Sequence, residues 1–291
     1  MKNHIIIVNP YAGNKKNIKY GIRVQKLLKK NNISSTIFIS NYIGHITEYV
    51  FNLSHKEDNR FYSIGGDGTL NEIVTGIIGT NSEIVVLSCG TGNDFAKTVN
   101  TYLSLRKVIS NSINKESKKV DVIKVNNKYS INILSAGFDA LVAKNVDIFR
   151  KVPLITGKIK YNLSIFYTLF FNKNFIFKIR VNDKIYKNHF TFVTISNGKF
   201  YGSGISPIPS AIVDDGILNV CIVDKTTHFD KIILLPKYKK SKHLDLNKVH
   251  IHKTEKISIV SNTPFPANID GEIFYTKKLN CKIIKKAINI V

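Results

Sequence analysis

The first third of the chain alternates short apolar runs with stretches whose apolar residues recur every three or four positions. The runs at residues 4–8, 35–39, 60–64 and 84–87 predict buried strands, because a strand covered on both faces needs no polar side. Helical spacing predicts helices over 17–30, 45–53 and 70–78, and another opens at residue 94. This alternation predicts a doubly wound α/β sheet through about residue 110.

Beyond about residue 120 the pattern becomes short alternating runs separated by turn residues. Residues 125–129 and 180–184 have the pattern of β-hairpins. We therefore predict an α/β domain over residues 1–120 and an antiparallel, sandwich-like β domain over 121–280. A cleft between two such domains is a usual ligand site.

The composition is strongly basic, with 43 Lys and Arg against 20 Asp and Glu, a net charge of +23. A hydrophobic content of 43% excludes a disordered chain. Abundant Lys, Asn and Ile fit an AT-rich coding bias, which explains only part of the excess. No helix-turn-helix, zinc-finger or RNP-type motif is present, so we expect an anionic membrane surface rather than a nucleic acid as partner.

Membrane-spanning and secretory segments are not expected. Residues 161–177 are interrupted by Asn, Ser and Lys, and the apolar run at the N-terminus is too short for a signal peptide. Cys89, Cys221 and Cys281 form no CxxC pair, which favours a reducing compartment. We predict a cytoplasmic protein that associates peripherally with a membrane.

The most informative motif is GGDGTLNE, which leaves a predicted strand and enters a helix. Gly65, Gly66 and Gly68 let backbone N–H groups approach phosphate oxygens, and the helix N-terminus adds positive potential. Asp67 would repel phosphate there unless a cation lay between them, so we predict Mg²⁺. The alternative is a glycine-rich turn with a capping Asp.

A second strand-to-helix loop, GTGNDFA, follows the fourth predicted strand. Thr91 is predicted to contact a nucleotide, and Asp94 to help order the metal and the acceptor, although Asp94 could serve only as an N-cap. Neither a Walker A loop nor a dinucleotide fingerprint fits this spacing. The loop at residues 9–14 and Ser40 follow the first two strands, and the same sheet edge would bring them together.

Two later acidic segments are candidates outside the α/β half. Asp215 in an Asp-Asp-Gly segment could bind Mg²⁺ with nearby carbonyls. Glu272, after Asp270-Gly271, is the best general-base candidate in the second half. A simple turn is the alternative at both places.

Together, NPYAG, GGDGTLNEIVTG, GTGNDFA, NILSAGFDA, NGKFYGSG, DDGILNV and the late DGE resemble the bacterial diacylglycerol-kinase-like lipid kinases. Their catalytic domain is shared with sphingosine and ceramide kinases, and the resemblance runs from residue 5 to about 284. It implies an ATP- and Mg²⁺-dependent kinase that phosphorylates a lipid hydroxyl, first of all that of diacylglycerol. It also implies that residues 281–291 return toward the first domain.

The resemblance assigns roles to individual residues. Glu272 would be the base, Asp67 would organise the catalytic Mg²⁺, and Asp94 would support it. A structural Mg²⁺ would bind Asp215 and the carbonyls of Ile212 and Ile217. ATP would contact Asn9, Pro10, Gly13, Ser40, Gly65, Gly66, Asp67, Gly68, Thr69, Leu70, Asn71 and Thr91.

Several alternatives stay open at this stage. The acceptor could be a sphingoid base, phosphatidylglycerol or a polyprenol, and a soluble NAD-kinase-like enzyme is the next candidate. A non-catalytic lipid or nucleic-acid binder is a further one. Oligomeric state is not encoded in these motifs, so a homodimer also stays open.

Overall fold

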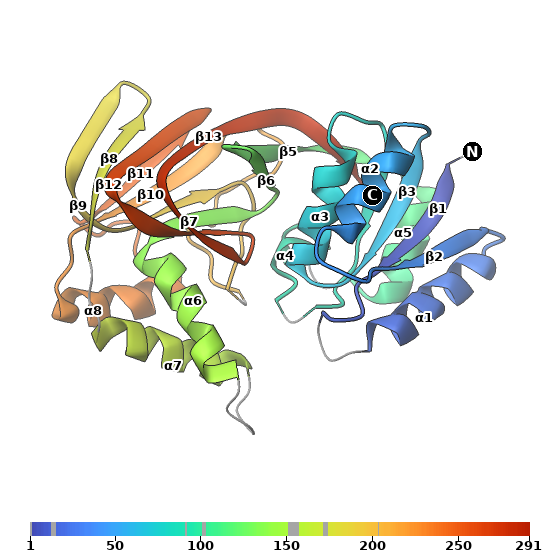
Figure 1. Cartoon of the computed structure of the whole chain (residues 1–291), viewed down its shortest axis with the longest axis horizontal. Helices are drawn as coiled ribbons and strands as arrows, with labels where there is room; N and C mark the ends of the chain where they lie inside the picture. Colours follow the sequence, from blue (N-terminus) through green and yellow to red (C-terminus); the bar gives the residue numbers. More distant parts are fainter. Residues whose placement is uncertain are drawn as a thin grey trace. The chain divides into compact units, whose positions relative to one another are not determined.

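The computed structural model describes residues 2–12, 16–90, 92–100, 103–150, 157–170, 174–202 and 204–291. It divides into two compact units, Met1–Val122 with Ile284–Val291, and Ile123–Ile283. Two strands, β5 (Lys118–Val125) and β13 (Glu272–Ile290), continue from one unit into the other (Figure 1). None of the helices within the described ranges combines the length and apolarity needed to cross a bilayer.

The first unit is built on a parallel sheet with helices on both faces. Its strands are β1 (Asn3–Val8), β2 (Ser35–Ile39), β3 (Asn59–Ile64) and β4 (Glu83–Val86), in the order β4-β3-β1-β2. Its helices are α1 (Asn17–Lys29), α2 (His45–Ser54), α3 (Asp67–Ile77), α4 (Asp94–Asn100) and α5 (Leu105–Asn114). The predicted doubly wound arrangement is confirmed.

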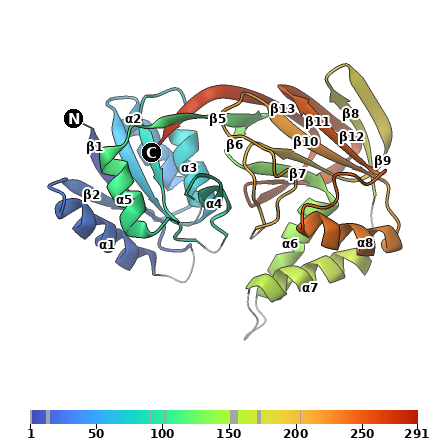
Figure 2. The ribbon, with the colours of Figure 1, turned by 180° about the vertical axis from the view of Figure 1, so that it is seen from behind.

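Alternation along the strands explains the two helical layers. Ile6 and Val8 belong to a core that also contains Val24 of α1 and Val108 of α5. The intervening residues, such as Ile7, are buried as well, because α2 and α3 pack together over the other face. Figure 2 shows α1 and α5 beside one another on one side of this sheet.

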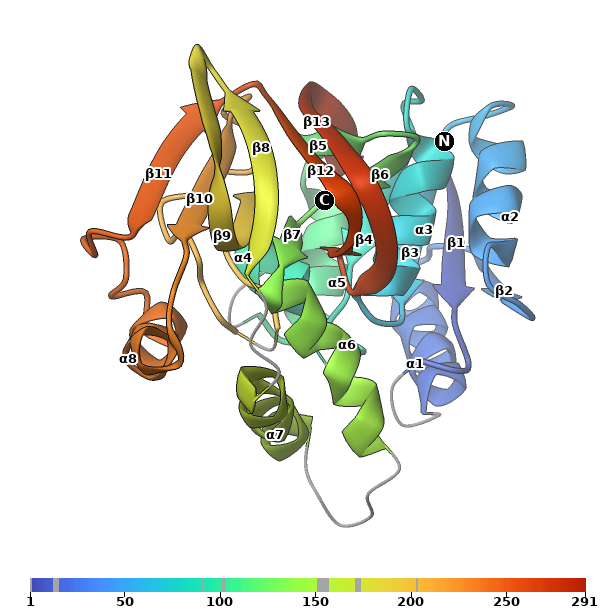
Figure 3. The same ribbon diagram turned by 60° about the vertical axis from the view of Figure 1, so that its left-hand side comes forward.

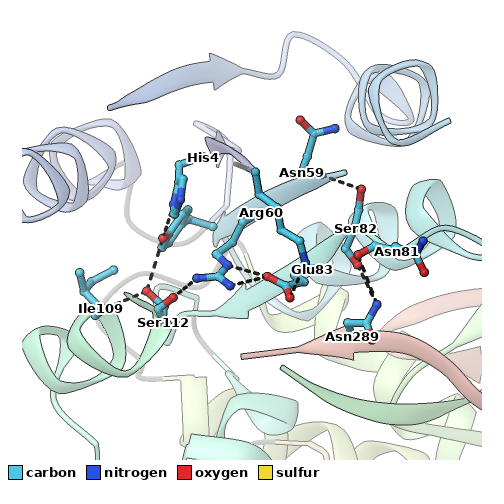
Figure 4. A network of polar contacts seen from close by, with 11 residues as sticks. His4, Asn59, Arg60, Asn81, Ser82, Glu83, Ile109, Ser112 and Asn289 are labelled. Carbon is cyan, nitrogen blue, oxygen red and sulfur yellow. Dashed lines mark hydrogen bonds and ion pairs between the residues drawn. The ribbon is translucent and has the colours of Figure 1, made fainter. Parts of the chain in front are cut away.

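The end of the chain adds a fifth parallel strand to this sheet, next to β4. Asn289 pairs with Glu83, and its side chain donates to the carbonyls of Asn81 and Ser82, both at 3.4 Å. Beside them, Arg60 donates through Nε to Oε2 of Glu83 at 2.6 Å (Figure 4). This polar network lies where β3 and β4 begin, at the opposite edge from the loops that follow these strands.

The second unit is an antiparallel sheet in the order β11-β10-β9-β7-β12-β13, and it confirms the predicted β-rich half. Its further strands are β6 (Lys128–Ser130), β7 (Ile133–Gly137), β8 (Phe175–Val181), β9 (Lys184–Ser196), β10 (Leu218–Asp224), β11 (Val249–Thr254) and β12 (Lys256–Ile269). β8 pairs with both β9 and β12, and these two strands also pair with β7. The sheet therefore folds back around an apolar core that includes Phe177, Ile259 and Phe265.

Three helices in the second unit were not expected from the sequence. They are α6 (Phe138–Arg150), α7 (Gly157–Phe170) and α8 (His228–Lys239), and they lie on the same side of the strands (Figure 3). Phe138 of α6 and Leu234 of α8 share a second core with Cys221 of β10. The helices thus cover the outer face of a sheet that the alternating pattern alone would leave exposed.

Candidate functional site in the first unit

The loops that carry the predicted motifs meet at one edge of the parallel sheet. All four strands run in the same direction, so Asn9, Ser40, Gly65 and Gly90 follow their carboxyl ends. Backbone hydrogen bonds continue the pairing into the loops, from Asn9 N to Ile64 O at 3.0 Å. Residues far apart in the sequence are thereby brought to one edge.

The first loop is fixed by a side chain that sequence reasoning missed. Asn17, buried at the start of α1, donates its amide to the carbonyls of Asn9 at 2.8 Å and Ala12 at 2.9 Å. Asn9 in turn accepts from Tyr11 N at 3.0 Å. No capping pattern marks this contact, because Asn17 is the first residue of α1 and not its N-cap, and its amide donates to the loop carbonyls.

The glycine-rich loop is shaped by close packing against the helix that it opens. A Cβ atom at Gly65 would lie 2.1 Å from Oγ1 of Thr69, so this position accepts no larger residue while Thr69 stays in place. Helix α3 begins at Asp67, not at residue 70 as predicted, with Gly66 as the extended N-cap residue. The N–H groups of the first helical turn therefore follow directly on the sheet edge, as an anion-binding site requires.

Asp67 joins the two glycine-rich loops. Its Oδ1 accepts hydrogen bonds from the backbone N–H groups of Asp94 at 3.0 Å and Phe95 at 3.3 Å, so it caps helix α4. Burial and the negative charge of Asp94 raise the pKa of Asp67, and these N–H groups and Lys97 oppose part of that rise. Oδ2 of Asp67 also lies 3.4 Å from Asp94 N, so both oxygens of the carboxylate contact the start of α4, and the predicted metal role of Asp67 stays a prediction.

The carboxylates of Asp67 and Asp94 face the same small space. A Cβ atom at Gly92 would lie 2.9 Å from Oδ2 of Asp67 and 3.3 Å from Oδ2 of Asp94. Asp94 is buried and its Oδ1 pairs with Lys97 Nζ at 3.0 Å. Two carboxylate oxygens that face one space are donors that suit a hard cation such as Mg²⁺.

Glu72, the last residue of GGDGTLNE, plays a part that the sequence did not indicate. Its Oε2 accepts from the backbone N–H groups of Gly44 at 3.1 Å and Ile46 at 3.2 Å, at the start of α2. Burial raises the pKa of Glu72, although these hydrogen bonds oppose the shift. Both acids of the motif thus bind the N-terminus of a neighbouring helix.

The other predicted nucleotide contacts differ in their exposure. Ser40, Thr69 and Leu70 are buried, whereas Pro10 and Asn71 are half-buried. Gly68 has open space around it, because nothing lies within 4 Å of an added Cβ atom. Gly13 and Thr91 fall outside the described residues.

The later acidic candidates belong to the second unit. Glu272 is exposed at the start of β13 and pairs with Lys128 Nζ at 2.5 Å. Asp215 is exposed, and its Oδ1 accepts from Ile217 N at 3.0 Å, which is a local turn contact. Ile212 is also exposed. Across the described residues, no group of three or more His, Cys, Asp and Glu side chains forms a ready-made metal site.

Asp270, two residues before Glu272, organises the backbone around it. Its carboxylate accepts from Ile131 N at 2.9 Å and Ile133 N at 3.0 Å, and from Ser130 Oγ at 2.9 Å. Asp270 has a positive φ of 48°, which places the turn before Glu272. The late DGE motif therefore combines a structural acid with an exposed one.

A buried polar cluster lies under α6 and α8. Asp139 of the NILSAGFDA segment accepts from Tyr201 Oη at 2.9 Å, and Tyr201 contacts Tyr238 Oη at 3.1 Å. Burial raises the pKa of Asp139, and the hydrogen bond from Tyr201 opposes that shift. This cluster connects the helices to the sheet and was not found from the sequence.

Comparison with known proteins agrees with this architecture. Residues 3–125 match the diacylglycerol kinase catalytic domain, and residues 132–291 match the YegS C-terminal NAD kinase beta sandwich-like domain. These two domains define a kinase of two parts. The chain belongs to the diacylglycerol-kinase-like lipid kinase family.

Individual relatives cover nearly the whole chain. Candidate lipid kinases of Staphylococcus aureus strains MSSA476 and MW2 are each 30% identical over 95% of this chain and 92% of their own length. A crystal structure of a candidate diacylglycerol kinase from Bacillus anthracis strain Sterne superposes with a TM-score of 0.80 at 25% identity. That match covers 100% of this chain and 97% of the other.

Proposed function

We propose that this kinase transfers the γ-phosphate of ATP to the hydroxyl of diacylglycerol, with Mg²⁺, and yields phosphatidic acid. The observation that carries the proposal is the pair of carboxylates, Asp67 and Asp94, that face one space at the N-termini of α3 and α4. Other lipid hydroxyls are the alternative acceptors. The S. aureus and B. anthracis relatives are named for lipid and diacylglycerol substrates, which supports this order of preference.

The nucleotide phosphates are assigned to the glycine-rich edge. Gly68 leaves open space beside the first turn of α3, so phosphate oxygens can reach N–H groups that have no partner within the helix. Asp67 and Asp94 would bind Mg²⁺, which neutralises charge on the phosphate oxygens when bound. Lys97 balances the charge of Asp94 at 3.0 Å.

Glu272 is assigned the role of general base. The acceptor oxygen attacks the γ-phosphorus, the bond to the bridging oxygen breaks, ADP leaves, and the hydroxyl proton moves to Glu272. Its carboxylate is exposed and pairs with Lys128 Nζ at 2.5 Å, so an acceptor hydroxyl can reach it. Asp270 supports this role because it orders the turn before Glu272.

Peripheral attachment to an anionic membrane is part of the proposal. The net charge of +23 supports it, because basic side chains are attracted to anionic headgroups. We expect vesicles with anionic lipid to raise the activity on diacylglycerol and added salt to reverse the rise. Equal rates on neutral and anionic vesicles would contradict this part alone.

The test is an acceptor panel analysed by mass spectrometry. The full chain is incubated with ATP and Mg²⁺ and with diacylglycerol, sphingosine, phosphatidylglycerol, a polyprenol or NAD, and a parallel series contains EDTA. We expect phosphatidic acid as the main product and no product with EDTA. Phosphorylation of NAD alone, or no product from any acceptor, would overturn the proposal.

A further inference from the structure

A basic groove lies within the β-rich unit, apart from the glycine-rich loops of the first unit. A groove of about 690 Å³ is lined by strands β5, β8, β12 and β13. Four cationic side chains line it, Lys124, Arg180, Lys256 and Lys282. Its volume falls within the range of small-molecule sites, which is about 300–1,000 Å³.

Strand register explains why these side chains gather. Lys256 of β12 lies directly opposite Lys282 of β13, and two positions further along Ser258 lies opposite Asn280. Ser258 also lies opposite Arg180 of β8. Because side chains alternate between the two faces of a sheet, residues two apart on each strand share one face. The groove is therefore one continuous sheet surface.

The polar residues of the groove add neutral donors between the cations. Ser258 supplies a hydroxyl and Asn280 an amide, in the row next to Lys256 and Lys282. Asn126 orders the edge of the groove, because its side chain accepts from Asn280 N at 2.9 Å. Hydroxyl, amide and cationic donors on one surface are the groups that bind phosphate oxygens.

No acid balances this charge inside the groove. Of the described residues that line it, none is Asp or Glu. Asp183 and Glu255 adjoin the lining residues Asn182 and Lys256 in the sequence but do not line the groove. Like charges directly across a ladder destabilise a sheet, so the facing Lys256 and Lys282 cost stability when the groove is empty. An anion bound between them would remove that cost.

We propose that this groove binds a phosphate-bearing ligand with at least two negative charges, at a site separate from the glycine-rich loops of the first unit. The ligand is either a soluble phosphate ester or the headgroup of an anionic phospholipid. Both present the same phosphate oxygens to Lys256, Lys282 and Arg180. Through this site the β-rich unit would bind phosphate-bearing molecules other than the ATP that is assigned to the first unit.

The test compares two double variants with the same loss of charge. Lys256→Gln/Lys282→Gln removes the facing pair of the groove, whereas Lys178→Gln/Lys187→Gln removes another facing lysine pair that does not line it. Binding of pyrophosphate is measured by calorimetry. Binding to phosphatidylcholine vesicles with and without phosphatidic acid is measured by co-sedimentation.

We expect the groove variant to lose at least about tenfold in affinity in one of the two arms, because each lost charge-assisted hydrogen bond weakens binding by roughly that factor. Loss for pyrophosphate indicates a soluble ligand, and loss confined to phosphatidic acid vesicles indicates a headgroup. Unchanged affinity in both arms, or an equal loss in the control variant, would overturn the proposal.

A site-resolved measurement separates this groove from the nucleotide loops. Pyridoxal phosphate carries a phosphate and an aldehyde that labels nearby lysines, and borohydride makes the label permanent for peptide mapping. We expect labelling of Lys256 or Lys282 that pyrophosphate prevents. Labelling of Lys178 to the same extent, without protection, would contradict a specific phosphate site.

Discussion

A Cβ atom added to Gly90 would lie 2.4 Å from the Cα atom of Gly66, so the two glycine-rich loops of the first unit touch along their backbones. This contact brings the loop after β4 against the loop after β3. It also explains why Asp67, one residue beyond Gly66, reaches the start of α4. The GGDGTLNE loop and the GTGNDFA loop are thus one packed structure.

Replacing Gly90 tests this contact. Gly90→Ala should destabilise the chain by about 1–3 kcal/mol, because backbone atoms of Gly66 have nowhere to move. Gly68→Ala is the matched control, since the added methyl meets nothing within 4 Å and alanine favours the helix. Urea unfolding measures both. Equal stability of the two variants would show that the loops tolerate separation.

Removing Glu72 tests its role at α2. Glu72→Ala should lower the free energy of unfolding by about 1 kcal/mol, because two N–H groups at the start of α2 lose their acceptor. The exposed Glu57 gives a control, Glu57→Ala, with the same change in charge. A Glu72 variant as stable as this control would contradict the capping role.

The Arg60–Glu83 pair makes stability depend on pH. The side chains are only 14% and 5% exposed, so Glu83→Gln should lower the free energy of unfolding by about 1–3 kcal/mol at neutral pH, because Arg60 loses its charged partner. Burial alone would raise the pKa of Glu83, but hydrogen bonds from Lys2, Ser117 and Arg60 hold it below the usual 4.5.

The sign of this dependence follows from the lowered pKa. The ionised form is favoured in the folded state, so the contribution of Glu83 is complete above pH 4.5 and is lost as the pH falls through the folded pKa. The free energies of unfolding of the wild type and of Glu83→Gln, measured from pH 7 downward, should converge in acid. A difference in unfolding free energy that stays constant with pH would rule out the charged Arg60–Glu83 pair as its cause.

His243 should make the second unit sensitive to mild acid. It is fully buried beside Tyr238, with ring centroids 4.4 Å apart. Burial lowers its pKa from 6.5 to about 4, and the backbone of Pro207 opposes only part of the shift. Between these values the unfolded chain binds a proton that the folded chain refuses, so stability falls as the pH drops from 6.5 toward 4.

The loss of stability that His243 causes between pH 6.5 and 4 is roughly 3 kcal/mol. His243→Gln should flatten the decline in unfolding free energy between pH 7.5 and 5, whereas His189→Gln, at an exposed position of β9, should leave it unchanged. Parallel curves for the wild type and His243→Gln would exclude His243 as the titrating group.

Glu272→Gln tests the proposed base. The variant should lower kcat by roughly 100-fold or more, because proton transfer to a positioned base contributes about that much, and ATP binding should stay close to that of the wild type. Lys128→Gln breaks the ion pair but keeps the carboxylate, so it separates the two effects. Wild-type kcat in Glu272→Gln would make the base assignment wrong.

The order of helices and strands in the first unit could be read from the sequence because its strands are continuous apolar runs and its helices have one apolar face. The glycine-rich segments were also readable, since a loop that must approach another backbone needs residues without Cβ atoms. Their meeting at one edge followed from parallel strand direction alone.

The second unit shows where local patterns were insufficient. Helix α8 was not predicted, although Thr227 and Asp230 form a capping box that marks its start. Helix α7 carries apolar residues on more than one side, so its periodicity is weak, whereas α6 has one apolar face and was missed because it directly follows strand β7.

By itself, the sequence determined the two-part architecture, the kinase family and the loops that can approach phosphate, because each depends on residues close together in the chain. Only the tertiary structure decided that Asp67 and Glu72 cap helices α4 and α2, that Asn17 fixes the first loop, and that Lys256 faces Lys282. These contacts depend on strand register and helix packing, which join distant residues and leave no periodic trace along the chain.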